Sequence, residues 1–143
     1  MSNEKRLELR ASAPTDFHVD VDGVGHFIFA RRTIRDEMRI GAEYSRFIEG
    51  VEQPTSFLDS MAGWISTLNV LTVEAPHNWN PEGMDPFDED THEKILKVYG
   101  ALRTKEGEFR RQKAARSAGE NSGPGTGAAP ELLVSPAVPP AAE

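Results

Sequence analysis

The apolar pattern of the chain changes its period at Thr33, and this change constrains the fold more than any other feature. Before it, residues 17–32 alternate between apolar and polar side chains around Asp22-Gly23, the pattern of a β-hairpin. After it, apolar residues recur every three or four positions, as in amphipathic helices. Thr33 suits a helix N-cap, and Asp36 suits the returning bond of a capping box. The sequence therefore predicts a strand pair that leads directly into a helix.

The faces of the predicted hairpin determine its register. Its apolar face is predicted to hold Phe17, Val19, Val21, Phe27 and Phe29. All five residues lie on the same side of the hairpin only if the numbers of the two residues in each cross-strand pair sum to an even value. This condition requires a loop with an odd number of residues. We predict a three-residue loop that ends at a left-handed Gly23 and sets His18 opposite His26. We expect the histidine pair on a polar outer face; the alternative is a metal site, for which no third ligand is in view.

About three helices are predicted after the hairpin. The first ends at Gly50, and its wide apolar face combines two stripes: Ile34, Met38, Ala42 and Ser45, and Ile40, Tyr44, Phe47 and Ile48. The second has Pro54 in its first turn and is expected to be the most buried element. Its apolar face is predicted to contain Phe57, Leu58, Met61, Ile65, Leu68 and Leu71. Its β-branched end, residues 70–73, either frays or becomes extended.

The third helix follows a polar loop that carries three large apolar side chains. We expect Trp79, Met84 and Phe87 to fold over the domain. The helix is predicted to begin at Asp90 or Thr91, to bury Ile95, Val98, Tyr99 and Leu102, and to continue as a solvated extension.

The C-terminal composition limits the folding unit. Residues 117–143 contain 15 Ala, Pro or Gly among 27 residues, and no aromatic or basic residue. Such a segment buries too little apolar surface to offset the entropy of ordering it, so we predict a disordered tail after a globular domain of residues 1–116. Residues 6–10 are a candidate edge strand, which would extend the hairpin to three strands. The predicted fold class is α+β, mostly α.

No motif in the sequence supports catalysis. The chain has no cysteine, no phosphate-binding glycine loop, no nucleophile elbow and no dinucleotide fingerprint. Asp85, Asp88, Glu89 and Asp90 lack the spacing of a calcium loop, so we interpret them as helix-capping residues. The sequence therefore predicts a protein that is not an enzyme, with no catalytic, cofactor-binding or metal-binding residues.

Charge and hydropathy restrict the partners. The net charge of −7 argues against general nucleic-acid binding, although the basic stretch 110–116 leaves a nucleic-acid-binding regulator as an alternative. No apolar run reaches the roughly 20 residues of a membrane span, and the N-terminus lacks a signal-peptide core. We expect a soluble protein that binds another protein and no membrane.

Three arginines at the strand-to-helix junction are the candidate partner-binding residues. Arg31, Arg32 and Arg35 are predicted to contact an acidic partner surface. The alternative is that this segment only fixes the geometry of the junction, because Asp36 and Glu37 already supply negative charge to the helix N-terminus.

Three segments resemble small tail assembly chaperones of long-tailed bacteriophages and prophages. They are "FIFARRTIRDEMRIGAEYSRFIEG", "MAGWISTLNVLTVEAPHNWN" and "MDPFDEDTHEKILKVYGALRTKEGEFRR", and the resemblance covers residues 17–111. It implies a non-enzymatic protein of the host bacterial cytoplasm that binds the tape measure protein and helps the tail tube protein to polymerise around it. In many phages a translational frameshift also yields a longer form of such a chaperone.

A second function remains open, namely a small structural tail-completion or head-completion protein of the virion. The sequence also leaves open whether the chain forms a homo-oligomer.

Overall fold

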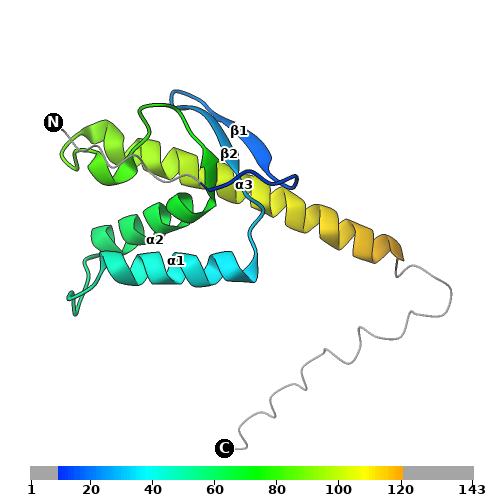
Figure 1. Ribbon diagram of the computed structural model, residues 1–143, viewed down its shortest axis with the longest axis horizontal. Helices are drawn as coiled ribbons and strands as arrows, with labels where there is room; N and C mark the ends of the chain where they lie inside the picture. Colours follow the sequence, from blue (N-terminus) through cyan, green and yellow to red (C-terminus); the bar gives the residue numbers. More distant parts are fainter. Residues whose placement is uncertain (1–9, 121–143) are drawn as a thin grey trace, which may run out of the picture. The chain divides into compact units, whose positions relative to one another are not determined.

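The structure is a computed structural model, and it describes residues 10–120. In chain order its elements are β1 (Phe17–Val21), β2 (Gly25–Phe29), α1 (Ile34–Phe47), α2 (Ser56–Leu71), β3 (Thr72–Glu74), the 3₁₀ turn η1 (Pro81–Gly83) and α3 (Glu89–Glu120). Figure 1 shows these elements along the chain. A small antiparallel sheet with three helices confirms the predicted fold class, α+β and mostly α.

The chain groups into two compact units, Met1–Lys105 and Glu106–Glu143. The first contains the sheet, α1, α2 and the start of α3, whereas the described part of the second is the remainder of α3. Residues 117–120 of the predicted tail are helical, and the rest of that tail lies outside the described residues. The candidate edge strand at residues 6–10 also lies outside them except for Arg10, which is not in a strand.

The sheet has the order β1-β2-β3, and its third strand is the extended end of the α2 segment. Ile28 pairs with Glu74, and Phe29 pairs with Thr72 across a local irregularity. The alternative of an extended rather than a frayed end of this segment is therefore confirmed.

The hairpin keeps the predicted faces but shifts the predicted loop by one residue. Phe17 pairs with Phe29 and Val19 with Phe27, so the even-sum rule and the three-residue loop are confirmed. The loop is residues 22–24 with the left-handed Gly23 in its middle, and His26 therefore pairs with Asp20. Because the loop is shifted by one residue, the predicted pairing of His18 with His26 is wrong. Gly25 pairs with Val21 and closes the loop, at a position where Pro76 leaves no room for a side chain.

The helix ends agree with the predicted caps to within a few residues. Thr33 is the N-cap of α1, and its capping box with Asp36 is complete. The helix ends at Phe47 rather than at Gly50, which adopts a positive φ in the following turn. Thr55 caps α2, so Pro54 precedes that helix and is not in its first turn. α3 begins at Glu89, one residue before the predicted start.

The core lies within the first unit, where the sheet, α2 and the start of α3 meet. Its buried members are Val19, Val21, Phe27, Phe29, Met61, Leu68, Leu71, Trp79, Ile95, Val98 and Leu102. Trp79 meets Phe27 edge to face, with 5.1 Å between the ring centroids, so the loop after β3 closes the core as expected. With six buried residues α2 is the most buried of the helices, although β3 buries a larger fraction of its residues, so the prediction holds among the helices and not among all elements.

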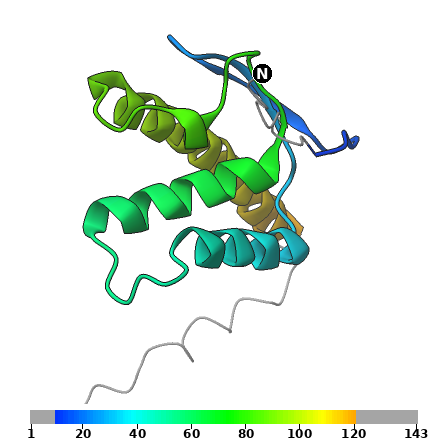
Figure 2. The ribbon, with the colours of Figure 1, turned by 60° about the vertical axis from the view of Figure 1, so that its left-hand side comes forward.

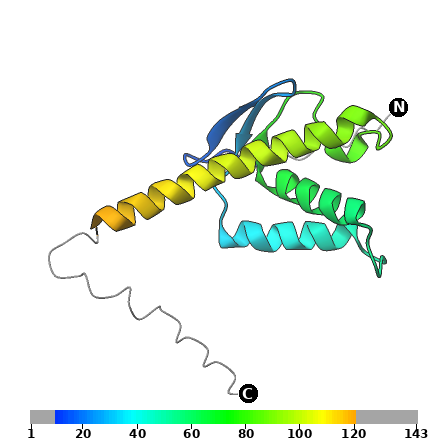
Figure 3. The ribbon, with the colours of Figure 1, turned by 180° about the vertical axis from the view of Figure 1, so that it is seen from behind.

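Two expectations about burial are wrong. Phe87 is 93% exposed and does not cover the domain. In α1, the stripe that begins with Ile34 and Met38 faces solvent, whereas Ile40, Tyr44, Phe47 and Ile48 are half-buried. The reason is visible in Figures 2 and 3, where α2 lies between α1 and the start of α3, so that within residues 10–120 α2 is the only helix packed beside α1.

Candidate partner-binding surface

The outer side of α1 carries two large apolar side chains in solvent. Ile34 is 75% exposed and Met38, one turn later, is 71% exposed. The same side continues through exposed small residues at Gly41, Ala42 and Ser45. We call these five residues the α1 face. Exposed apolar side chains aligned along a helix are typical of a protein-binding surface.

Arginine side chains border the α1 face. Arg35 is three residues from Met38, and Arg39 is three residues from Ala42, so each is a neighbour of the face on the helix surface. Both are exposed, and neither has an ion-pair partner among residues 10–120. The α1 face is thus apolar in its centre and positively charged along one edge.

The three predicted arginines have different surroundings. Arg35 borders the α1 face, whereas Arg32 turns to Glu37 with an Nη1–Oε1 distance of 2.9 Å. Arg31 is exposed in the segment just before the helix. The structure adds Arg39, which sequence reasoning missed, although its spacing of four residues from Arg35 could have indicated a shared edge.

A buried ion pair fixes the start of α1. Asp36 is 2% exposed in its side chain, and its Oδ1 lies 2.5 Å from Nη1 of Arg10. Its Oδ2 accepts hydrogen bonds from the backbone N–H and the hydroxyl of Thr33. Burial raises the pKa of Asp36, but these hydrogen bonds and the charge of Arg10 outweigh it, so the pKa lies below 3.8. The carboxylate therefore anchors the helix that presents the α1 face.

The other end of α1 is held by polar contacts to two later elements. The Tyr44 hydroxyl donates to Asp59 on α2, and this bond is the main reason that the pKa of Tyr44 is raised. Arg46 contacts Glu43 at 2.9 Å and Glu82 of η1 at 3.2 Å. These two carboxylates raise the pKa of the Arg46 guanidinium.

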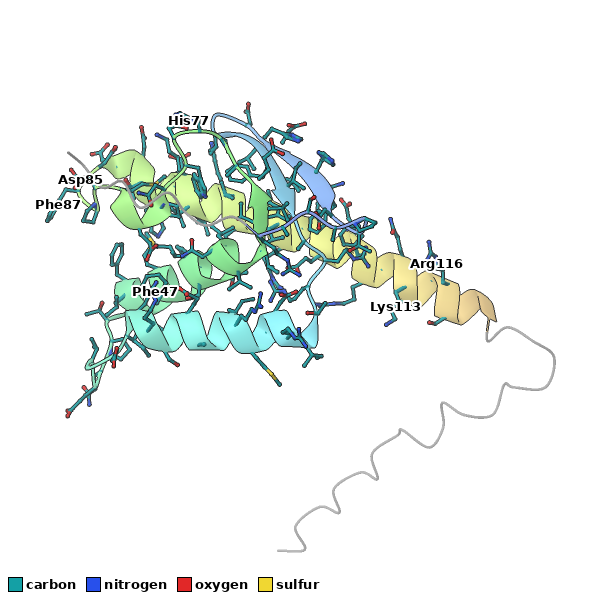
Figure 4. All side chains as sticks on the ribbon, viewed as in Figure 1. Phe47, His77, Asp85, Phe87, Lys113 and Arg116 are labelled. Atoms are coloured by element: carbon teal, nitrogen blue, oxygen red, sulfur yellow. The ribbon has the colours of Figure 1, made fainter. Side chains whose placement is uncertain are left out.

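A second apolar surface lies beyond that end of α1, where α2, η1 and the first turns of α3 meet. It is an open pocket of about 370 Å³, lined by Phe47, Phe57, Met61, Ile65, Pro81, Glu82, Met84, Pro86, Thr91, His92 and Ile95. Phe57 is 52% exposed, and its ring is stacked on that of His92 with 6.4 Å between the ring centroids. Figure 4 shows Phe47, Asp85 and Phe87 toward the same end of this unit. We call this feature the α2–α3 pocket.

Acidic residues flank the pocket lining in the sequence. Asp85 lies between the lining residues Met84 and Pro86, and Asp88, Glu89 and Asp90 precede the lining residues Thr91 and His92. Asp88 accepts the N–H of Asp90 in the first turn of α3, which confirms helix capping for this residue, whereas Asp85 accepts the N–H of Phe87 in the loop before the helix. No group of three or more potential ligands within residues 10–120 is arranged to hold a metal ion. The carboxylates of Asp85, Asp88 and Glu89 have no cation partner in this described range.

The outer face of the hairpin contains a second polar group. Although His18 and His26 are not directly opposite, Nδ1 of His18 lies 2.9 Å from Nε2 of His26. Nδ1 of His26 lies 2.6 Å from Oδ1 of Asp20, which is 88% exposed. These contacts agree with a polar outer face.

In the second unit, α3 carries the basic stretch that left nucleic-acid binding open. Arg110, Arg111, Lys113 and Arg116 are all exposed, and Figure 4 labels two of them. None of the helices within residues 10–120 has the length and apolarity needed to cross a membrane.

Comparisons of the chain with protein-family models, with curated proteins and with solved structures found no match. The α1 face and the α2–α3 pocket are the surfaces that bear on its function.

Proposed function

We propose that this protein is a non-enzymatic tail assembly chaperone of a long-tailed bacteriophage, which binds the tape measure protein in the host bacterial cytoplasm. The observation that carries the proposal is the α1 face, where Ile34 and Met38 are 75% and 71% exposed on a helix that packs against α2 with its other side. The resemblance of residues 17–111 to such chaperones supplies the identity of the partner. The tail tube protein is the second proposed partner.

The chemistry of the α1 face defines the partner segment that it fits. An amphipathic helix can place its apolar side along Ile34 and Met38, and the small residues Gly41 and Ala42 allow the two backbones to approach closely. Arg35 and Arg39 favour carboxylates on the partner helix beside its apolar stripe. The proposed ligand is therefore an acidic amphipathic helix of the tape measure protein.

Co-expression of this chain with the tape measure protein tests the proposal. We expect the chain to raise the soluble fraction of the tape measure protein and to co-purify with it. Met38→Asp should abolish both effects, because it places a charge at the centre of the α1 face. Val51→Asp is the matched control, since Val51 is 40% exposed but lies outside the face. Equal partner solubility with wild type and Met38→Asp would contradict the proposal.

The alternative, a structural tail-completion or head-completion protein, makes a different prediction about the virion. A chaperone should be absent from purified particles, whereas a completion protein should be present at a defined copy number. Mass spectrometry of purified virions separates the two functions.

A further inference from the structure

The outer face of the hairpin brings two histidines and one carboxylate together. His18 and Asp20 lie on the exposed side of β1, and His26 pairs with Asp20 across the strands. Nδ1 of His18 lies 2.9 Å from Nε2 of His26, and Nδ1 of His26 lies 2.6 Å from Oδ1 of Asp20. All three residues are exposed, so an ion can reach them from solvent. We call these three residues the hairpin cluster.

The contact with Asp20 determines which nitrogen of His26 carries a proton. An ionised carboxylate only accepts hydrogen bonds, so Nδ1–H of His26 donates to Oδ1 of Asp20. In neutral His26 the lone pair is then on Nε2, which is the atom that faces His18. Metal-bound histidines commonly donate their second ring N–H to a carboxylate in this way. Asp20 therefore holds His26 in the form that binds a metal ion.

His18 supplies a second nitrogen at the same place. The two rings have 5.1 Å between their centroids and are tilted by 33°. Neutral His18 exposes the lone pair of Nδ1 when its proton is on Nε2, and this exchange of tautomers changes no net charge. Because both rings are on the solvent side of the hairpin, they can turn until both lone pairs point at one ion.

The distance between these two nitrogens indicates the class of ion. Two nitrogens at about 2.0–2.1 Å from one ion are roughly 2.9 Å apart at a right angle and roughly 3.3–3.4 Å apart at a tetrahedral angle. The observed 2.9 Å fits the right angle. Square-planar and tetragonal sites with right angles are typical of Cu²⁺ and Ni²⁺, whereas Zn²⁺ is usually tetrahedral.

The hairpin cluster offers two protein ligands and leaves further coordination positions open. Within residues 10–120 no group of three or more potential ligands could hold a metal ion, and Asp20 is already bonded to His26. Water or a donor atom of another molecule would fill the open positions, so the bound ion remains exchangeable.

We propose that the hairpin cluster is a surface site for a divalent transition-metal ion, Cu²⁺ before Ni²⁺. The ligands are Nε2 of His26 and Nδ1 of His18, and Asp20 is a positioning residue that orients His26. The ion joins β1 to β2 through these two side chains. This site is independent of the α1 face and of the proposed partner.

Metal titration of the full chain without an affinity tag tests the site. Isothermal titration calorimetry measures binding of Cu²⁺, Ni²⁺ and Zn²⁺ after treatment with a chelator. The variants are His18→Ala, His26→Ala, Asp20→Ala and Asp20→Asn. His77→Ala is the matched control, because His77 is an exposed histidine outside the hairpin cluster. Circular dichroism establishes that each variant is folded.

We expect one Cu²⁺ to bind at the hairpin cluster, and Ni²⁺ to bind more tightly than Zn²⁺. Each histidine variant should lose at least roughly a hundredfold in Cu²⁺ affinity, and His77→Ala should bind as wild type does. Asp20→Ala should weaken binding roughly tenfold. Asp20→Asn should recover most of this loss, because its amide oxygen still accepts the N–H of His26.

Two further measurements report on the bound state. Electron paramagnetic resonance of the Cu²⁺ complex should show two imidazole nitrogens in wild type and in Asp20→Ala, and one in each histidine variant. Saturating Cu²⁺ should raise the thermal midpoint of wild type, because the ion binds the folded hairpin, and should do so less in the histidine variants.

Three results would overturn the proposal. The first is a Cu²⁺ affinity that is unchanged in the folded variants His18→Ala and His26→Ala. The second is Zn²⁺ binding that is tighter than Ni²⁺ binding, which contradicts the right-angle geometry. The third is an equal loss in Asp20→Ala and Asp20→Asn, which removes the positioning role of Asp20.

Discussion

Asp36 joins two parts of the chain that are remote in sequence, because its carboxylate binds both Arg10 and the cap residue Thr33. We predict that Asp36→Asn lowers the free energy of unfolding by about 2–4 kcal/mol, since it removes one partner of a buried ion pair and half of a capping box. Urea denaturation near neutral pH measures the loss. Glu37→Gln is the matched control, because Glu37 is exposed on the same helical turn, and it should cost much less.

The same residue predicts a pH dependence. The pKa of Asp36 in the folded protein lies below 3.8, its ordinary value, so the unfolded chain binds more protons in this range. Its contribution to stability is complete above the ordinary pKa and is lost as pH falls through the folded-state pKa. The difference in stability between wild type and Asp36→Asn should therefore shrink as pH falls through this window. A difference that stays constant in acid would contradict this assignment.

Substitution of Gly41 should affect helix stability and partner binding in opposite directions. It lies in the interior of α1, and a methyl group at this position would meet no atom within 4 Å. Gly41→Ala should stabilise the protein by about 0.5–1 kcal/mol, because glycine is a poor helix former. It should also weaken binding to the α1 face by filling the space for a close approach.

Gly100→Ala is the control for this prediction, since Gly100 is equally unobstructed but lies on α3. Thermal unfolding should show a similar gain for both variants, and a partner-binding titration should show a loss for Gly41→Ala alone. A loss of stability in Gly41→Ala would show that the position is already covered.

At the scale of single residues, the sequence predicts local hydrogen bonds but does not predict which apolar side chains are exposed. The bond between Thr33 and Asp36 spans three residues, so the capping box could be predicted from spacing alone. The exposure of Ile34 and Met38 could not be predicted, because periodicity groups residues on one side of a helix without showing what covers that side. Arg10 as the partner of Asp36 was also beyond reach, since no local pattern links them.

The hairpin depends on two glycines for different reasons. Gly23 needs its positive φ of 76°, while a side chain at this position would meet no atom within 4 Å. Gly25 has a φ of 141°, and a methyl group there would lie 2.5 Å from Cγ of Pro76. We predict that Gly23→Ala costs about 1–2 kcal/mol and that Gly25→Ala costs more, because strain and overlap add at Gly25.

Urea denaturation of the two variants measures the loss in free energy of unfolding and shows which substitution costs more. Pro76→Ala in the background of Gly25→Ala should recover part of the loss by removing the overlap. No recovery in the double variant would assign the whole effect to backbone strain at Gly25.

At the level of helices and strands, predictions from the sequence fail where the structure depends on contacts between residues that are far apart in the chain. The alternation of Phe17, Val19 and Val21 determines which hairpin side is buried, and this was predictable. The position of the loop was missed by one residue, because the alternation requires only that paired residue numbers sum to an even value, and both registers satisfy this condition. Pairing of Thr72 with Phe29 likewise selects an extended end for the α2 segment over a frayed one.

The boundary between the two units of the chain, after Lys105, lies just beyond the last residue of the core. All buried apolar residues of the core lie between Val19 and Leu102, within the unit that ends at Lys105. We predict that a chain of residues 1–105 unfolds cooperatively, with a midpoint within a few degrees of that of the full protein. Calorimetry checks this expectation. A broad or absent transition would show that residues 106–143 are needed for the fold.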